Sequence, residues 1–451
     1  MNMLRPSKQL KALLRFSNFL TFAIILPLGA DAQIQPQVLV SFDGTNSNDP
    51  IAGLTLGPDG ILYGTTWGGD GVGGSAFRVT TNGALTTLFA FGSTNGATVI
   101  GGLVVGPDGN FYGTTDAGGD FSVADGFGGG TVFRITANGD LTSLYAFPWS
   151  ANPQDTPTVG PDGNIYGTET GMGETVFKVD TATGVLTNFV SSISFEIAHP
   201  VAGLTVGSDG ILYGTSSTGG SSANGTFYKV TTNGVFSILA SFDGTNGASP
   251  IANLTLAEDG SFYGVAQSGG EFGKGTLFNV TTNGDFTVLA SFDGTNGEDP
   301  WGTLLMGPDG NLYGTTSMGG QFGSGTVFET TTKGDLTTLI SFNGTNGAVP
   351  TGGLIVGSDG NFYGTTEAGG RFGAGTIFRL QSGAYAQSFG MTTNGFAVNV
   401  INVGGSGKVV VEASSDLIKW TAIQTNGPAA TMQFIDTRAK TQQQFYRTVQ
   451  Q

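Results

Sequence analysis

An Asp-Gly pair that returns at nearly constant intervals constrains the fold of this 451-residue chain more than any other feature. The spacings between its seven copies are 49, 54, 47, 50, 50 and 50 residues. The pairs begin at Asp59, Asp108, Asp162, Asp209, Asp259, Asp309 and Asp359. A fixed period of this length is typical of chains that copy one supersecondary unit many times. We therefore expect seven copies of one unit to build the core.

The residues around each pair predict strands joined by tight turns. The copy from Pro300 to Ile340 shows the pattern best: Gly307-Pro308-Asp309-Gly310 is followed by Asn311-Leu312-Tyr313-Gly314-Thr315-Thr316. The apolar stretches are short, rich in β-branched and aromatic residues, and bounded by Gly, Asn, Asp or Pro, and none keeps a helical period. Asp-Gly and Asn-Gly supply the positive φ angles of hairpin turns. Each copy should hold four antiparallel strands.

Seven four-stranded units predict an all-β fold, a seven-bladed β-propeller over residues 37–383. A β-helix would have a shorter period, and a sandwich would not repeat. The segment Gln37–Phe42 resembles the end of an internal copy, Leu289–Phe292, which the last copy lacks after Leu380. We expect this N-terminal strand to complete the final blade, so that the propeller has no open edge.

Antiparallel alternation assigns the connections to two faces. With strands a to d named in chain order, strand a should line the central channel. The glycine-rich b–c loop and the Asp-Gly-Thr-Asn-Gly d–a loop then share one face, here called the long-loop face. The tight a–b and c–d turns share the other, here called the short-turn face. A ligand is expected on the long-loop face.

The repeated motifs also resemble a known family. Leu62-Tyr63-Gly64-Thr65-Thr66, Leu312-Tyr313-Gly314-Thr315-Thr316 and Phe362-Tyr363-Gly364-Thr365-Thr366 are each followed by Gly-Gly, and the last is completed by Thr376-Ile377-Phe378. This pattern, from about Val38 to Leu380, is similar to the choice-of-anchor tandem repeat GloVer-containing proteins. The resemblance implies a bacterial exported repeat protein and brings no established activity, catalytic residue or cofactor. The chain departs from the family at Phe445-Tyr446-Arg447, where no apolar tail or basic stop follows, which argues against covalent anchoring.

The two ends of the chain differ from the repeats. Residues 1–32 are predicted to be a signal peptide: four basic residues precede the apolar run Phe16–Leu28, and Ala30-Asp31-Ala32 offers a cleavage site. The run is too short to span a bilayer. We expect an exported protein that is secreted, periplasmic or at the cell surface, with no membrane span. Residues 384–451 show a different alternation, which predicts a small β-sandwich-like domain.

Charge and residue usage exclude several function classes. Without the signal peptide the chain has 13 basic and 32 acidic residues, so nucleic acid is not expected as a partner. One histidine, His199, and no cysteine argue against Ser-His-Asp and Cys-His nucleophiles and against the usual zinc sites. The Asp-Gly-Thr-Asn-Gly runs invite a calcium reading, but they lack the EF-hand order of ligands and form turns unaided. No cofactor is expected.

Candidate ligand-binding residues are the aromatic and acidic residues expected on the long-loop face. They are Trp67, Asp70, Asp120, Glu271, Phe272, Trp301, Phe322, Glu367 and Phe372. Each loop phenylalanine could stack on a sugar, although a hydrophobic plug that orders its loop is the favoured interpretation. The acids, with Asp116, Glu298 and Asp299, scatter among the copies without an evident pair, whereas glycoside cleavage needs two carboxylates at a set separation.

These observations favour an exported, non-catalytic binding scaffold for an extracellular glycan or protein. A carboxylate-dependent carbohydrate-active enzyme and a structural cell-surface component are the alternatives. The oligomeric state and the ligand are left open by the sequence.

Overall fold

The structure is a computed structural model, and it describes most of the repeat region and the strands at both ends. The described residues are 12–15, 21–24, 36–45, 47–68, 73–119, 128–148, 151–171, 175–191, 197–381, 385–392, 395–403, 409–414, 421–426, 429–436 and 445–450. The chain divides into two compact units, the repeats and a unit built mainly from its two ends. Every regular element in these ranges is a strand.

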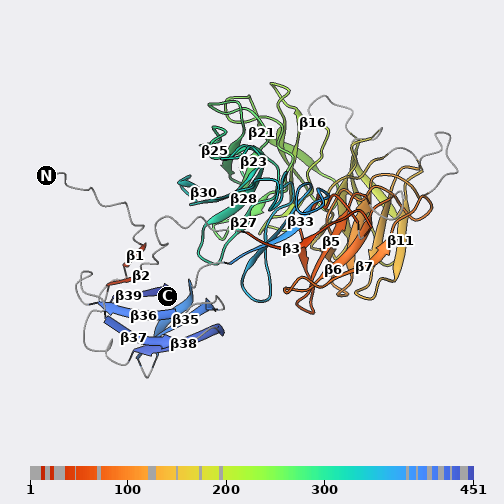
Figure 1. The fold of residues 1–451 in the computed structure, drawn as a ribbon. Helices are drawn as coiled ribbons and strands as arrows, with labels where there is room; N and C mark the ends of the chain where they lie inside the picture. The colour runs from red at the N-terminus through yellow and green to blue at the C-terminus, as the bar shows by residue number, and fades with distance from the viewer. Residues whose placement is uncertain are drawn as a thin grey trace. The chain divides into compact units, whose positions relative to one another are not determined.

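The repeats form seven sheets arranged as the blades of a propeller (Figure 1), which confirms the predicted architecture. Blade 1 consists of β4 (Thr55–Leu56), β5 (Leu62–Thr66), β6 (Ser75–Val79) and β7 (Leu85–Ala90). Blade 2 consists of β8 (Val104–Val105), β9 (Phe111–Thr115), β10 (Thr131–Ile135) and β11 (Leu141–Ala146). Blade 3 consists of β12 (Thr158–Val159), β13 (Ile165–Thr168), β14 (Thr175–Val179) and β15 (Leu186–Ser191).

The remaining blades follow the same order of strands a to d. Blade 4 consists of β17 (Thr205–Val206), β18 (Leu212–Ser216), β20 (Thr226–Val230) and β21 (Phe236–Ser241), and its loops pair through β16 (Ile197–Ala198) and β19 (Thr218–Gly219). Blade 5 consists of β22 (Thr255–Leu256), β23 (Phe262–Ala266), β24 (Thr276–Val280) and β25 (Phe286–Ser291). Blade 6 consists of β27 (Leu305–Met306), β28 (Leu312–Met318), β29 (Thr326–Thr330) and β30 (Leu336–Ser341), with β26 (Glu298–Pro300) added beside β28. Blade 7 consists of β31 (Ile355–Val356), β32 (Phe362–Thr366), β33 (Thr376–Leu380) and β3 (Gln37–Ser41).

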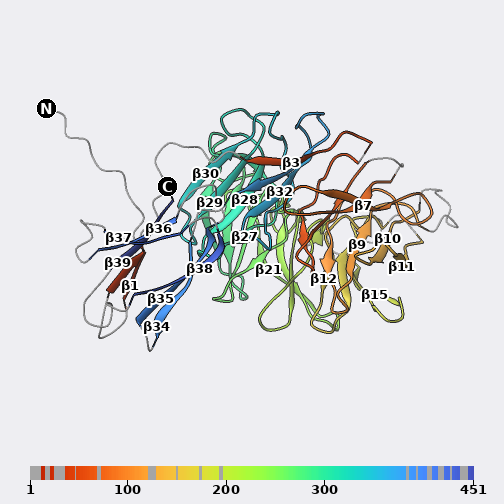
Figure 2. The ribbon, with the colours of Figure 1, turned by 60° about the horizontal axis from the view of Figure 1, so that its bottom comes forward.

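The N-terminal strand closes the ring, as the sequence predicts. β3 pairs antiparallel with β33, in a register that sets Val38 opposite Phe378 and Ser41 opposite Thr376. Figure 2 shows β3, coloured red, lying with the blue strands of blade 7. The last blade is thus completed by the first strand of the ring, which leaves no open edge between blades 7 and 1.

Repeated aromatic residues hold neighbouring blades together. The tyrosine of each strand b packs on the next blade: the rings of Tyr63 and Phe111 are 4.0 Å apart, and those of Tyr313 and Phe362 are 4.6 Å apart. Tyr213 and Phe262 form the same contact at 4.5 Å. The recurring tyrosines therefore contribute to packing between blades.

The Asp-Gly turn and this tyrosine form one local unit on the short-turn face. Tyr313 Oη donates to Asp309 Oδ2 at 2.8 Å, and the backbone N–H of Asn311 donates to Asp309 Oδ1 at 3.2 Å. Blades 1 to 4 repeat the tyrosine bond. A Cβ at Gly307 would lie 2.6 Å from the Tyr313 ring, which favours glycine at this repeat position, although blade 5 has Ala257 there. Asp, Gly and Tyr therefore recur for a structural reason.

The second unit contains two sheets. The five-stranded sheet has the order β1 (Ala12–Arg15), β2 (Thr21–Ile24), β39 (Phe445–Gln450), β36 (Val409–Ser414) and β37 (Thr421–Asn426). The three-stranded sheet has the order β34 (Tyr385–Thr392), β35 (Gly395–Val403) and β38 (Ala429–Asp436). Their side chains lie outside the described residues, so the sandwich-like packing stays a prediction.

The segment predicted to be a signal peptide supplies β1 and β2, and β2 runs parallel to β39 with Ile24 beside Tyr446. Cleavage after Ala32 would leave β39, β36 and β37 in that sheet, and the cleavage itself stays a prediction. In the described part of the chain, no helix has the length and apolar character to cross a bilayer.

Candidate ligand-binding face

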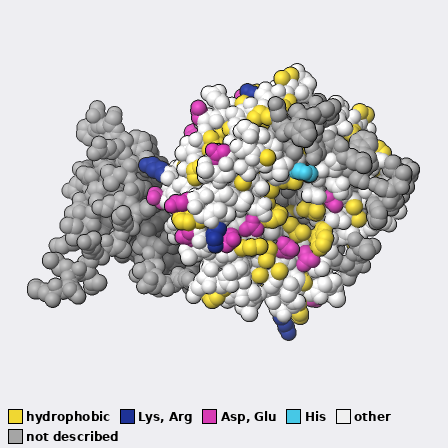
Figure 3. Space-filling view, turned by 90° about the horizontal axis from the view of Figure 1, so that it is seen from above, with side chains coloured by type: hydrophobic (Ala, Val, Ile, Leu, Met, Phe, Trp, Pro, Cys, Tyr) yellow, Lys and Arg dark blue, Asp and Glu magenta, His cyan; other side chains and the backbone are white. Residues whose placement is uncertain are grey.

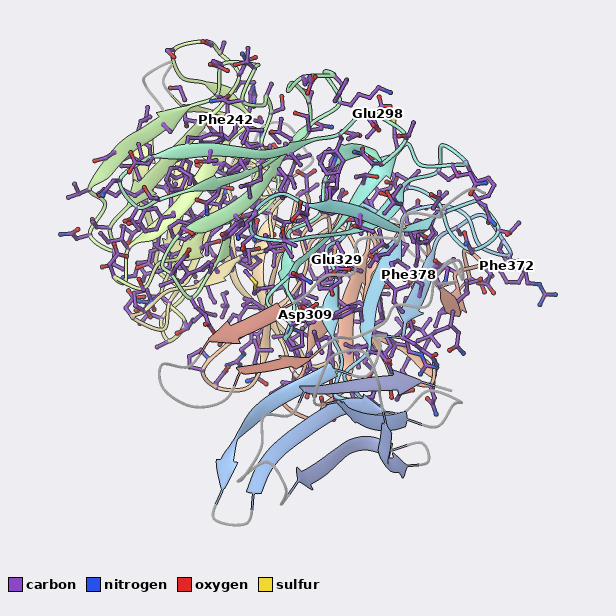
Figure 4. The ribbon with its side chains drawn as sticks, turned by 90° about the vertical axis from the view of Figure 1, so that its left-hand side faces the viewer. Phe242, Glu298, Asp309, Glu329, Phe372 and Phe378 are labelled. Atoms are coloured by element: carbon purple, nitrogen blue, oxygen red, sulfur yellow. The ribbon has the colours of Figure 1, made fainter. Side chains whose placement is uncertain are left out.

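The long-loop face is built from pairs of loops joined by backbone hydrogen bonds. In blade 5 the N–H of Gly270, in the b–c loop, donates to the carbonyl of Gly244, in the d–a loop, at 2.9 Å. The same bond joins Gly320 to Gly294 and Gly370 to Gly344, each at 2.8 Å. Figure 4 shows Glu298, in a d–a loop, and Asp309, in an a–b turn, at opposite ends of blade 6. Glu298 lies on the long-loop face and Asp309 on the short-turn face. The loops are therefore braced against each other.

One position of the d–a loop has a left-handed backbone in every blade. Seven of the nine described non-glycine residues with positive φ occupy it, with φ between 52° and 61°. They are Asp49, Thr98, Asn152, His199, Ser249, Asp299 and Val349. Non-glycine residues adopt this conformation at a cost of roughly 1 kcal/mol. Six types of residue occupy this position, although glycine would adopt the left-handed conformation more easily.

Hydrogen bonds explain this backbone. The N–H of Asp49 donates to the carbonyl of Ala374 in the b–c loop of the preceding blade, at 3.1 Å, and the N–H of Val349 donates likewise to Ser324 at 3.0 Å. The carbonyl of Val349 then accepts from the N–H of Glu367, just after strand b of its own blade, at 3.0 Å. The left-handed residue thus joins two blades at their seam, which fixes its backbone and leaves its side chain free to vary.

Two further rings of residues accompany the left-handed ring. The residues that follow strand b are Trp67, Asp116, Thr170, Ser217, Gln267, Ser317 and Glu367. The residues that lead toward strand a are Ile51, Ile100, Gln154, Val201, Ile251, Trp301 and Thr351. Strands a of neighbouring blades contact one another, as expected at the axis of the propeller. We call the three rings together the mouth of the channel.

Side chains of the mouth contact one another across blades. Asn152 Nδ2 and Gln154 Nε2 of blade 3 donate to Asp116 Oδ1 of blade 2, at 3.2 and 3.0 Å. In blade 6, Ser317 Oγ donates to Asp299 Oδ2 at 2.6 Å. Figure 3, in which the single histidine marks the long-loop face, shows hydrophobic and acidic side chains intermingled around a hollow. The mouth combines polar, aliphatic and aromatic side chains.

The predicted ligand-binding residues fall into two places. Trp67, Trp301 and Glu367 belong to the mouth, and the two indoles are 47% and 39% exposed. Phe272, Phe322 and Phe372 lie at the tips of the b–c loops, with Glu271 beside the first of them. Asp70 and Asp120 lie outside the described residues.

The hydrophobic-plug interpretation of the loop phenylalanines is wrong. Their side chains are 52, 53 and 55% exposed for Phe272, Phe322 and Phe372. Phe272 and Phe322 lie within tight glycine turns, closed by the bonds from Gly273 N–H to the Gly270 carbonyl at 3.3 Å and from Gly323 N–H to the Gly320 carbonyl at 3.4 Å. Figure 4 shows Phe372 at the periphery and Phe378 within the blade, and the guanidinium of Arg371 lies 5.2 Å from the Phe372 ring centre.

Asp49 and Glu367 occupy the repeat positions that meet between neighbouring blades, as Asn152 and Asp116 do in blades 3 and 2. Burial raises the pKa of Glu367, and the charge of Asp49 raises it further. Burial also raises the pKa of Asp49. Asp49 belongs to blade 1 and Glu367 to blade 7, and ring closure brings the two blades together. The interpretation of the long-loop acids as scattered charges without an evident pair stays a prediction, and equivalence of repeat positions was the signal that could have pointed to Asp49.

Blade 3 differs from the others by two buried acids. Asp155 is 5% exposed; its Oδ2 accepts from the N–H of Thr168 at 3.3 Å, and its Oδ1 has no hydrogen-bond partner among the described residues. Burial raises the pKa of Asp155 to about 7. Glu169 is fully buried and accepts from the Thr175 hydroxyl at 2.5 Å. Other blades hold Ala or Gly in place of Asp155, so this blade carries an internal polar group that the repeat does not require.

The Asp-Gly-Thr-Asn-Gly loops use their carboxylates internally. Asp243 Oδ1 accepts from the N–H and the hydroxyl of Thr245 and from the N–H of Asn246, at 2.7 to 2.9 Å. These bonds lower the pKa of Asp243. Among the residues with described side chains, no group of three or more His, Asp or Glu could hold a metal ion. The absence of a cofactor stays a prediction.

Solved structures with a similar fold come from several kinds of protein. The chain is similar to the extracellular domain of a hybrid two-component system from B. thetaiotaomicron, with a TM-score of 0.55 and 11% identity over 83% of this chain and 45% of that one. It is also similar to a fungal alcohol oxidase of the AA5 family in complex with copper, with a TM-score of 0.52 and 13% identity over 90% and 88% of the two chains. The chain spans about half the length of the first of these proteins. At such identities the likeness shows the fold alone.

Sequence comparison identifies the repeat. No curated protein sequence matches the chain significantly. Three overlapping matches to the Gloeobacter/Verrucomicrobia repeat cover residues 29–175, 148–258 and 200–408. They confirm the resemblance seen in the repeated Tyr-Gly-Thr-Thr motif, and the chain belongs to the Gloeobacter/Verrucomicrobia repeat family.

Proposed function

We propose that this protein is an exported, non-catalytic binding scaffold whose long-loop face recognises a glycan or a protein. The observation that carries the proposal is the contrast between a constant backbone and varied side chains at the mouth. Seven copies of one repeat allow each position to be compared within a single chain. Positions that serve only the fold should be filled alike in every blade.

The mouth does not follow that expectation. Its left-handed ring holds six kinds of residue on one backbone conformation, and two of its other positions hold exposed tryptophans, Trp67 and Trp301. Exposed aromatic residues with nearby polar groups are typical of recognition surfaces. Exposed tryptophans, surrounded by side chains that differ from blade to blade, support a role of the mouth in binding.

Location outside the cytoplasm is supported by two observations. The first fold neighbour is described as an extracellular domain, and residues 1–32 have the features of a signal peptide. We propose that the protein is secreted, periplasmic or held at the cell surface, where a large acidic propeller could present its mouth to extracellular ligands.

One observation favours a second candidate, a carboxylate-dependent carbohydrate-active enzyme. Asp49 and Glu367 are close enough to influence each other, and both have a raised pKa, as acid and base residues of glycosidases can have. In that case Asp49→Asn and Glu367→Gln would each abolish turnover of a polysaccharide.

The test is binding of the purified mature chain to arrays of glycans and extracellular proteins, with a hydrolysis assay on every polymer bound. The scaffold proposal expects saturable binding without turnover, and loss of binding in the Trp67→Ala/Trp301→Ala variant. Background binding on the arrays together with hydrolysis of a test polymer would overturn it in favour of the enzyme.

A further inference from the structure

The mouth is not uniform around the ring. Three of its four carboxylates and both of its tryptophans belong to the adjacent blades 6, 7 and 1, whereas blades 3, 4 and 5 contribute uncharged polar or aliphatic residues and His199. We call this set the acidic-aromatic sector. It consists of Asp299, Trp301, Glu367, Asp49 and Trp67.

Hydrogen bonds show that the three blades of the sector are neighbours. Thr315 Oγ1 of blade 6 donates to the carbonyl of Gly352 in blade 7 at 3.0 Å. Thr351 Oγ1 of blade 7 donates to the carbonyl of Ile51 in blade 1 at 2.8 Å. The sector is therefore continuous across the closure of the ring.

The carboxylates of the sector have no basic partner among the mouth positions. The mouth positions include no Lys or Arg. Two basic residues of adjacent loops have other contacts: Lys274 Nζ is paired with Glu298 at 2.9 Å, and Arg371 lies over Phe372. The raised pKa values of Asp49 and Glu367 mean that their negative charges are held in an unfavourable place. A bound cation would stabilise both carboxylates, whereas an anionic ligand would be repelled.

Each tryptophan of the sector lies near one of its aspartates. The backbone N–H of Trp67 donates to the carbonyl of Asp49 at 3.0 Å. Trp301 follows two residues after Asp299, whose carboxylate is held by Ser317 Oγ. An indole face attracts cations and also offers a flat surface to a sugar ring. The sector thus combines ion pairing and stacking at both of its ends.

We propose that the acidic-aromatic sector binds a cationic glycan, an oligosaccharide of amino sugars whose free ammonium groups pair with the carboxylates while its rings stack on Trp67 and Trp301. This inference rests on the proposed function and names its ligand class. A basic peptide fits less well, because the backbone N–H groups of Asp49, Asp299 and Val349 already bond to neighbouring loops, so these positions offer no strand-like pairing.

The experiment is calorimetric titration of the mature full chain with four probes. They are an oligoglucosamine of defined length, its N-acetylated counterpart, an oligomannuronate of equal length and an oligolysine peptide. We expect the oligoglucosamine to bind, and the N-acetylated and anionic oligosaccharides to bind at least about tenfold more weakly. Added salt should weaken the binding of the oligoglucosamine.

Variants locate the site. Asp49→Asn/Glu367→Gln should weaken oligoglucosamine binding at least about tenfold, and Trp301→Ala should weaken it by a similar factor. The matched control is Asp285→Asn/Asp335→Asn, which removes the same charge from the short-turn face and should change the affinity less than about twofold. Unfolding midpoints of all variants confirm that they are folded.

Three results would overturn the inference: equal affinity for the N-acetylated form, tighter binding of oligolysine, or equal weakening by the control variant. If a neutral glycan or a protein binds at the mouth instead, the proposed scaffold function stands and this inference fails. If no glycan or protein binds at all, both fail.

Discussion

The short-turn face and the mouth are built from the same seven repeats, yet residue types are largely constant among the blades on the first and vary on the second. On the short-turn face, the hydrogen-bonded pair of Asp309 and Tyr313 recurs in most blades, and every blade except blade 5 has glycine at the position that the tyrosine ring crowds. At the mouth, the backbone recurs while the side chains change from blade to blade. The difference separates what the propeller needs in order to fold from what it presents to a ligand.

Blade 3 adds a third case, in which a varied residue is buried. Asp155, which is 5% exposed, replaces the small residue of the other blades. We expect substitutions at the mouth to change ligand binding. We expect substitution of a buried residue such as Asp155 to change the free energy of unfolding.

Asp155→Asn should change the free energy of unfolding most, in a pH-dependent way. Burial raises the pKa of Asp155 in the folded state to about 7, whereas the unfolded chain has the ordinary value of 3.8. The folded state therefore binds the proton more tightly than the unfolded state. As the pH rises from below 3.8 to above about 7, the wild-type protein loses up to about 4 kcal/mol of stability. Asn stays neutral throughout.

Denaturant unfolding of both proteins at about pH 4 and about pH 8 measures this effect. The variant should match the wild type at the lower pH and be more stable at the higher pH. Parallel stability profiles of the two proteins would show that Asp155 does not titrate between these values.

Gly264→Val should destabilise the propeller by about 2 kcal/mol or more. A Cβ at this strand position would lie 2.5 Å from Phe278 Cζ and 2.9 Å from Leu254 Cδ2, in the packed interior of blade 5. Urea unfolding measures the loss, with Trp301→Ala as the comparison from the mouth. The exposed indole should change the free energy of unfolding by less than about 0.5 kcal/mol, and a larger loss there would assign Trp301 to the fold.

Tyr313→Phe should cost about 1 kcal/mol, because it removes the hydrogen bond to Asp309 and keeps the ring. Tyr263→Phe is the matched control within the same chain, since Asp259 accepts from Ser261 instead, through both its N–H and its hydroxyl. The control should cost less in the same unfolding experiment. Equal losses would mean that the Asp-Tyr bond does not explain the recurrence of the pair.

Much of the fold could be predicted from the sequence, because the repeat reports local structure seven times. Turn residues, strand composition and the period were enough to predict the blades. The strand Gln37–Ser41, which precedes the first complete repeat, was enough to predict ring closure. The assignment of loops to one face followed from antiparallel alternation alone.

The candidate site was predicted only in part. Trp67, Trp301 and Glu367 could be placed on the long-loop face, but the left-handed conformation of Asp49 and its equivalents has no signal in residue type, since glycine is absent there. The influence of the Asp49 charge on Glu367 depends on ring closure, which brings the opposite ends of the repeat region together. The exposure of Phe272 was misjudged because an apolar residue in a glycine-rich loop can project as well as pack.

The central claim, that the mouth is the ligand surface, is tested most directly by thermal unfolding of the mature chain and of Trp67→Ala/Trp301→Ala across a panel of soluble polysaccharides and extracellular proteins. A ligand of the native state raises the unfolding midpoint. The account predicts equal midpoints for the two proteins alone and a ligand-induced rise that only the wild type shows. A rise of equal size in the variant would place the ligand elsewhere and contradict the claim.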